Sequence, residues 1–157
     1  MRYEEAGVHI EAKAEALRRA KAQLEATYTP EVLRGLGAFG GLFDAQALKG
    51  MRHPVLVATT DGVGTKTLLA LEAGDVFGLG FDLVNHSVND LLAQGARPLF
   101  FLDYLAASRL DEEVLAALLA SLAEACRAQG IPLLGGETAE MPGVYREGAW
   151  DLAGTLV

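Results

Sequence analysis

The sequence has a single cysteine, no cluster of basic residues and no long apolar run, and each shortage excludes a class of protein. Cys126, the one cysteine among 157 residues, cannot form an internal disulfide and suits a reducing compartment. The net charge is −8 at pH 7 without a run of Lys or Arg, which argues against nucleic acid or an anionic membrane as partner. No stretch of about twenty apolar residues is present to span a membrane. The N-terminus, Met1–Glu5, lacks the apolar core of a signal peptide, so we expect a cytoplasmic protein.

The remaining composition is typical of one folded domain. The chain is 51% hydrophobic and 22% charged, which excludes disorder, and its length suits one domain with a real core. Hydrophobic periodicity and turn residues predict helices over residues 10–27, 66–73, 81–95 and 110–129, and strands near 39–43, 54–60, 99–106, 131–134 and 150–157.

The most informative stretch is Asp61-Gly62-Val63-Gly64-Thr65-Lys66, which lies between a predicted strand and a predicted helix. Glycines let the backbone approach a ligand closely, and the first N–H groups of a helix point at an anion. A carboxylate beside a phosphate site normally needs a metal ion between them. The stretch therefore indicates a Mg-nucleotide or phosphate site, with an ordinary glycine turn and helix cap as the alternative.

The segment from Phe81 to Gly95 predicts a helix with two distinct faces. One face is apolar, and the other carries short polar side chains without Lys, Arg or Glu. Carboxylates, amides and an imidazole are groups that bind metals and orient ligands, although a solvated polar face is the alternative. The residues of this polar face are Asp82, Asn85, His86, Asn89 and Asp90.

Four further features of the sequence could each belong either to a ligand site or to ordinary structure. Lys21 falls in the middle of the apolar stripe predicted for the first helix, so it either extends to the edge of the packed face or points at a ligand. Asp103 interrupts an apolar strand and lies either at an edge or in a site. The segment 35–41 matches G-x-G-x-x-G, but it lacks the preceding strand and following helix of a dinucleotide site, so we reject that function. At the glycine pair before Glu137 and Thr138, a ligand could approach the backbone and meet a carboxylate and a hydroxyl. The alternative is an ordinary loop.

Four motifs, taken in their order along the chain, resemble the N-terminal half of the phosphoribosylformylglycinamidine cyclo-ligase family. Its members are also called aminoimidazole ribonucleotide synthetases. The motifs are Asp61–Lys66, Val88–Leu91, Pro98–Tyr104 and Gly135–Gly143. The resemblance implies ATP-dependent closure of formylglycinamidine ribonucleotide to aminoimidazole ribonucleotide in purine synthesis. It also implies an α+β fold, in which a mixed sheet has helices on one face and two chains join their sheets into a barrel-like homodimer. Residues 1–157 would be one ATP-binding and dimerisation domain, lacking the C-terminal domain of the family and inactive alone.

The resemblance also implies roles for individual residues, with ATP and Mg²⁺ as cofactors. It assigns no role to His86, because family members often carry another residue there. Catalytic roles fall on Lys21, Asp61 and Asp90, and Mg²⁺ ligation on Asp61, Asp90 and Glu137. ATP binding falls on Gly62, Gly64, Lys66, Asn89, Gly136, Glu137 and Thr138.

Two alternatives stay open at this stage. Other ATP-dependent enzymes of the same fold, such as thiamine-monophosphate kinase, share the Asn-Asp and Gly-Gly features. A non-catalytic dimerisation or nucleotide-binding module would instead leave Asp82, Asn89 and Asp90 solvated and would show no Mg-dependent ATP affinity.

Overall fold

The helices and strands follow the predicted order with a few shifted boundaries. The structure is a computed structural model that describes residues 10–157, so the expectation for Met1–Glu5 lies outside the described residues. None of the helices in this range combines the length and apolar character needed to cross a membrane. The elements are α1 (Ile10–Glu25), β1 (Val32–Arg34), β2 (Leu42–Phe43), the 3₁₀ helix η2 (Gln46–Gly50), β3 (Thr59–Gly62), α2 (Lys66–Ala73), α3 (Gly78–Ala93), β4 (Phe101–Ala107), α4 (Glu112–Ala128), β5 (Leu133–Glu140) and β6 (Trp150–Leu156).

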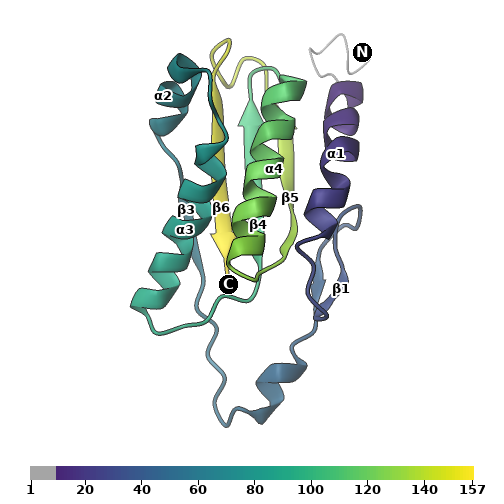
Figure 1. The fold of residues 1–157 in the computed structure, drawn as a ribbon, viewed down its shortest axis with the longest axis vertical. Coiled ribbons are helices and arrows are strands. Elements are labelled where there is room, and N and C mark those ends of the chain that lie inside the picture. The colour runs from purple at the N-terminus through teal and green to yellow at the C-terminus, as the bar shows by residue number, and fades with distance from the viewer. Residues whose placement is uncertain (1–9) are drawn as a thin grey trace.

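A mixed four-stranded sheet forms the centre of the fold, in the order β3-β6-β4-β5. Strands β4 and β5 run parallel and are joined through α4, as parallel neighbours require a crossover. Strand β6 lies antiparallel to both of its neighbours, β3 and β4. The long helices α1, α3 and α4 cover one face of the sheet (Figure 1). The predicted α+β class, with a mixed sheet and helices on one face, is confirmed.

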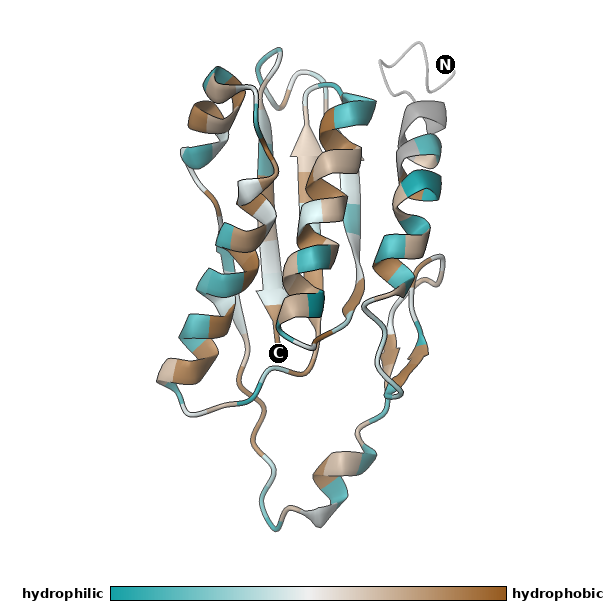
Figure 2. Ribbon diagram, viewed as in Figure 1, coloured by the Kyte–Doolittle hydropathy of each residue, from teal (hydrophilic) through white to brown (hydrophobic). Residues whose placement is uncertain are grey.

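The core lies between this helical layer and the sheet. Helices α3 and α4 are amphipathic, and Figure 2 shows apolar and polar residues alternating along both. Their buried faces carry Leu83, Val84, Leu118 and Leu122, each no more than 1% exposed. Cys126 is also fully buried, so it is a core residue as its place on the apolar stripe of α4 predicts.

Helices α3 and α4 approach each other closely at Gly80. A Cβ atom at this position would clash with Ser121 Oγ and would lie 2.5 Å from the backbone nitrogen of Leu122. Ser121 also donates a hydrogen bond to the carbonyl oxygen of Phe77, just before α3 begins. The absence of a side chain at Gly80 therefore sets how closely α3 can approach α4.

Residues 30–58 form an arm that extends below the sheet in Figure 1 and contains the small β1–β2 pair. The predicted strand over residues 54–60 is wrong at its start, because β3 begins only at Thr59. Val55 and Leu56 are 81% and 62% exposed and have no strand partner among the described residues. Their high β-propensity is insufficient without a neighbouring strand and a packed face.

Alanine substitutions at two glycines of α3 test the close approach of the helices. Gly80→Ala should lower the free energy of unfolding by about 1–3 kcal/mol, since α4 leaves no space for the added methyl group. Gly78→Ala, in the same helix, should leave stability unchanged or raise it by up to about 1 kcal/mol, because its Cβ would meet no atom within 4 Å. Urea unfolding measures both, and equal effects of the two substitutions would contradict this packing.

Candidate functional site

The turn that follows β3 has the predicted strand–turn–helix form. Asp61 and Gly62 end β3, Gly64 adopts a left-handed conformation with φ 58°, and α2 begins at Lys66. Thr65 makes no side-chain cap, so the first N–H groups of α2 rely on turn hydrogen bonds of 3.1–3.4 Å. The bonds of Lys66 and Thr67, at 3.4 and 3.3 Å, are longer than ordinary N–H···O bonds, so these two N–H groups can be shared with an incoming anion.

Helix α3 presents three residues to this turn from one side. Asp82, His86 and Asp90 are spaced by four residues and therefore lie above one another on the helix. Lys66 Nζ pairs with Asp82 Oδ2 at 2.8 Å, and His86 Nε2 lies 2.6 Å from Asp61 Oδ2. Asp90 Oδ2 accepts a hydrogen bond of 2.9 Å from the Thr59 hydroxyl. The polar face is thus about half exposed and also contacts β3 and α2 through an ion pair, a histidine–aspartate contact and a hydrogen bond.

The two asparagines of the polar face point to different surroundings. Asn85 Oδ1 accepts a hydrogen bond of 2.9 Å from Gln129 Nε2, at the end of α4. Asn89, predicted to orient ATP, is exposed on α3 next to Asp90. Asn85 therefore serves helix packing, while Asn89 remains available to a ligand.

Three residues form what we call the aspartate–histidine cluster: Asp61, His86 and Asp90. Each offers one ligand atom, and these atoms all lie within 4.8 Å of one another. The Gly62 N–H and the His86 imidazole both hydrogen-bond the Asp61 carboxylate and lower its pKa below the ordinary value. The sequence pattern placed His86 with Asp82 and Asp90 on one face of the helix, whereas the family resemblance assigned His86 no role. The structure brings its ring to Asp61.

The other predicted ATP-binding residues lie across the sheet. Gly136, Glu137 and Thr138 belong to β5, so the alternative of a loop at this position is wrong. Strands β3 and β5 are the two edges of the sheet, three inter-strand spacings or about 14 Å apart. Within one protomer the predicted residues therefore fall into two groups, one at β3 and one at β5.

Glu137 is separated from Asp61 by orientation as well as distance. The register places Asp61, Gly154, Asp103 and Gly136 in one row across the sheet, whose side chains share one face. Glu137 pairs with Tyr104 in the next row and projects to the opposite face. The structure thus brings Asp61 and Asp90 together, whereas a cation shared with Glu137 would need Glu137 from a second copy of the chain.

Lys21 lies on the same side of the fold as β5. Helix α1 packs against α4 and reaches β5. The buried face of α1 includes Ala20 and Leu24, at 2% and 1% exposed, whereas the Lys21 side chain is 63% exposed and lies 3.7 Å from Glu25 Oε1. The prediction that Lys21 falls in the middle of the packed stripe is therefore wrong, because Ala20 occupies that position.

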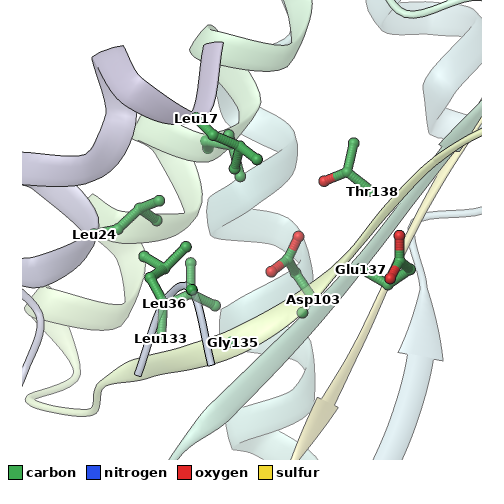
Figure 3. A pocket seen from close by; sticks show the side chains of 11 residues that line it. Leu17, Leu24, Leu36, Asp103, Leu133, Gly135, Glu137 and Thr138 are labelled. Carbon is green, nitrogen blue, oxygen red and sulfur yellow. The ribbon is translucent and has the colours of Figure 1, made fainter. Parts of the chain in front are cut away.

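A cavity of about 180 Å³ lies between α1, α4 and β5, which we call the leucine pocket. Figure 3 shows Asp103 and Thr138 projecting into the space opposite the leucine side chains. The pocket includes Gly37, so the predicted glycine-rich loop at 35–41 borders it. Its apolar walls are Leu17, Leu24, Leu36, Leu119 and Leu133.

Asp103 is the acidic residue of the leucine pocket and is only 8% exposed. Burial, reinforced by the nearby negative charge of Glu137, raises the pKa of Asp103 to about 7. A Cβ at Gly136 would clash with the Asp103 carboxyl group, so this position needs glycine. Of the two possibilities for Asp103, an edge or a site, the structure therefore places it in a pocket on an inner strand.

Comparison with known families gives a match over most of the chain. The family described as "AIR synthase related protein, N-terminal domain" matches residues 43–157. A phosphoribosylformylglycinamidine cyclo-ligase of Synechococcus sp. (strain CC9605) is 52% identical over 157 residues, which are 100% of this chain and 45% of that protein. The protein of the same name from Limosilactobacillus fermentum is 51% identical over 99% of this chain and 45% of its own length. The chain thus spans less than half the length of these curated relatives.

Solved structures share the fold at lower identity. Thiamine-monophosphate kinase from Stenotrophomonas maltophilia K279a superposes with a TM-score of 0.65 at 24% identity, over 90% of this chain and 40% of that one. The hydrogenase maturation protein HypE in complex with ATP superposes with a TM-score of 0.59 at 22% identity, over 85% of this chain and 36% of that one. These similarities establish the fold alone.

The raised pKa of Asp103 predicts a pH-dependent stability. Between the unfolded pKa near 4 and the folded value of about 7, the folded chain keeps a proton that the unfolded chain has released. The free energy of unfolding should therefore fall as pH rises through this window, by up to about 1.4 kcal/mol per pH unit. Asp103→Asn should remove this fall and be more stable than the wild type at pH 8.

Urea unfolding of both chains between pH 5 and pH 8 measures the difference in slope. Glu124→Gln, which neutralises an exposed carboxylate on α4, is the matched control and should keep the wild-type slope. Equal slopes for Asp103→Asn and the wild type would show that Asp103 does not titrate in this range.

Proposed function

We propose a function from the premise that this chain belongs to the family of AIR synthase related proteins, through a match to their N-terminal domain over residues 43–157. In this proposal the chain is the N-terminal, ATP-binding and dimerisation domain of a phosphoribosylformylglycinamidine cyclo-ligase. The relatives that bear this name are 50–52% identical to it, and their remaining length would supply the C-terminal domain. The observation that carries the ATP site is the meeting of Asp61 and Asp90 beside the turn into α2.

The proposed reaction consumes ATP to close a ring. The formyl oxygen of formylglycinamidine ribonucleotide takes the γ-phosphoryl group and ADP leaves. The amidine nitrogen then attacks the activated carbon and loses a proton, and phosphate leaves as aminoimidazole ribonucleotide forms. Phosphoryl transfer asks the protein mainly for positioning and for neutralisation of charge. The turn after β3 would position the phosphates through backbone N–H groups and supply positive charge through Lys66. Asp61 and Asp90 would hold a metal ion that neutralises further charge.

Mg²⁺ bound with ATP would neutralise phosphate charge in this site. The oxygens of Asp61 and Asp90 suit that ion, since Mg²⁺ is held by one or two carboxylates together with substrate phosphates. The imidazole of His86, the third member of the cluster, is not a typical Mg²⁺ ligand. We keep Glu137 as a candidate third carboxylate contributed by a second copy.

Lys66 is the cation proposed to meet the phosphates. It pairs with Asp82 at 2.8 Å, and both side chains are about half exposed. An exposed ion pair of this kind contributes less than about 1 kcal/mol, so a triphosphate can take over Lys66 at little cost. Gly62 and Gly64 allow the backbone to approach the ligand, and Asn89 would orient it from α3. On the β5 side, Lys21, Gly136 and Thr138 would contact a second part of the ligand.

We also propose a homodimer built on the uncovered face of the sheet. No helix within residues 10–157 covers the face that carries Leu102 and Tyr104 (Figure 1). The exposed Val55 and Leu56 lie a few residues before the edge strand β3, where a second chain could pair with them. The uncovered face supports two sheets joined face to face, and the exposed segment supports pairing with a second chain at the sheet edge. The cytoplasmic location stays a prediction.

The enzymatic alternatives are separated by substrate. The thiamine-monophosphate kinase structure is only 24% identical to this chain, whereas cyclo-ligases reach 52%. Incubation of a full-length protein carrying this chain with ATP and each candidate substrate would distinguish them by product. The non-catalytic alternative predicts no product from either substrate.

Removing one carboxylate tests the proposed ATP site. Asp90→Asn should weaken Mg²⁺-dependent ATP binding at least tenfold, about 1.4 kcal/mol, because an amide is a poorer ligand for a hard cation. Titration calorimetry with and without Mg²⁺ measures the loss on the 157-residue chain. Glu124→Gln, an exposed acid on α4, should bind like the wild type. Unchanged binding by Asp90→Asn would remove the cluster from the ATP site.

A charge in the arm tests the proposed dimer. Val55→Asp should convert dimers to monomers, since it places a carboxylate in the segment that would pair with a second chain. Val144→Asp is the matched control, because Val144 is 70% exposed in the loop between β5 and β6. Sedimentation velocity measures both variants, and a Val55→Asp chain that remains dimeric would place the interface elsewhere.

A further inference from the structure

The donor atoms of the aspartate–histidine cluster do not match the all-oxygen environment that Mg²⁺ prefers. Asp61 and Asp90 offer carboxylate oxygens, but His86 offers a ring nitrogen, Nε2, within the same 4.8 Å. Mg²⁺ is bound by oxygen ligands, whereas imidazole suits cations such as Zn²⁺ and other late first-row divalent ions. A nitrogen in this position therefore changes which cation the site favours.

We propose that the aspartate–histidine cluster binds a nitrogen-accepting divalent cation of the Zn²⁺ or Co²⁺ type in preference to Mg²⁺, and that His86 determines this selectivity. The inference deepens the proposed function, because it concerns the cation of the same ATP site. A single side chain of α3 would thus determine which cation binds.

The three ligands come from elements that hold them in place. Asp61 ends β3, which is hydrogen-bonded to β6, and His86 and Asp90 lie four residues apart on α3. Each carboxylate also accepts a hydrogen bond from a group outside the cluster. Asp61 Oδ1 accepts the Gly62 N–H at 2.7 Å, and Asp90 Oδ2 accepts the Thr59 hydroxyl at 2.9 Å. Hydrogen bonds of this kind orient the ligands of metal sites.

Only small movements separate this arrangement from a coordination sphere. Ligand atoms about 2.0–2.2 Å from one ion lie at most about 4.4 Å apart. The three ligand atoms lie within 4.8 Å of one another, and this bound is only a few tenths of an ångström above that limit. Asp61 Oδ2 and His86 Nε2, now 2.6 Å apart, would separate slightly to admit the ion between them. Both side chains are about half exposed, so solvent, and not packed side chains, surrounds much of them during this adjustment.

The local charge also suits a divalent cation. With neutral imidazole, the two carboxylates give the cluster a charge of −2, which one divalent ion balances. The neighbouring cation, Lys66, is paired with Asp82 and does not occupy the cluster. The alternative is an exposed His–Asp contact without a metal, which would contribute at most about 1 kcal/mol to stability.

Metal titrations of the 157-residue chain test the proposal without an activity assay. Calorimetry with Co²⁺, Zn²⁺ and Mg²⁺, each alone, should show both transition ions binding at least tenfold more tightly than Mg²⁺. His86→Asn should weaken Co²⁺ and Zn²⁺ binding at least tenfold and change Mg²⁺ binding less than twofold. It should also alter the visible absorption of bound Co²⁺, since a nitrogen ligand is lost. His53→Asn is the matched control, because His53 is an exposed histidine outside the cluster and should behave like the wild type.

Any other outcome would contradict the proposed cation selectivity. Unchanged Co²⁺ affinity and spectrum in His86→Asn would show that the imidazole is not a ligand. Equal losses for all three ions would show that His86 only supports the local structure. If either result for His86→Asn occurs while Asp90→Asn still weakens Mg²⁺-dependent ATP binding at least tenfold, the proposed selectivity is wrong and the proposed function stands. If ATP binding also proves independent of any cation, the two fail together.

Discussion

The position of α3 depends on the close approach of its backbone to α4 at Gly80. Because no Cβ fits there, the two helices lie closer than side chains would allow, and the rotation of α3 about its axis is fixed. That rotation buries Leu83 and Val84 and turns the opposite, polar side toward β3. The contacts of Asp82, His86 and Asp90 with the segment 59–66 are thus a consequence of helix packing several residues away.

Local patterns in the sequence were sufficient to predict most of the helices and the turn at Asp61. The 3.6-residue period placed α2, α3 and α4 within a few residues, because an amphipathic helix is specified by its own side chains. Strand boundaries were less predictable, since a strand needs a partner. The sequence could not show that Val55 and Leu56 lack a neighbour within the chain, or that β5 continues to Glu140 beside β4.

The residue types of the candidate site could be predicted, but not which of these residues the fold brings together. Asp61 and Asp90 were identified from residue chemistry and family resemblance, and the fold brings them together. The separation from Glu137 follows from the strand order β3-β6-β4-β5, which no local pattern encodes. Lys21 was misplaced because alanine counts weakly in a hydrophobic stripe, although Ala20 lies at the centre of the packed face.

Strand β6 has a consequence for the order in which the site can form. Asp61 reaches its place in the sheet only by pairing with Gly154, and β3 has no other strand neighbour among residues 10–157. During synthesis, the ribosome must therefore release β6 before Asp61 can be anchored opposite α3. The parallel pair β4–β5 with α4 can assemble earlier from contacts closer in sequence. A nascent chain that stops short of β6 would carry both aspartates and the histidine yet present no organised centre to a nucleotide or a metal.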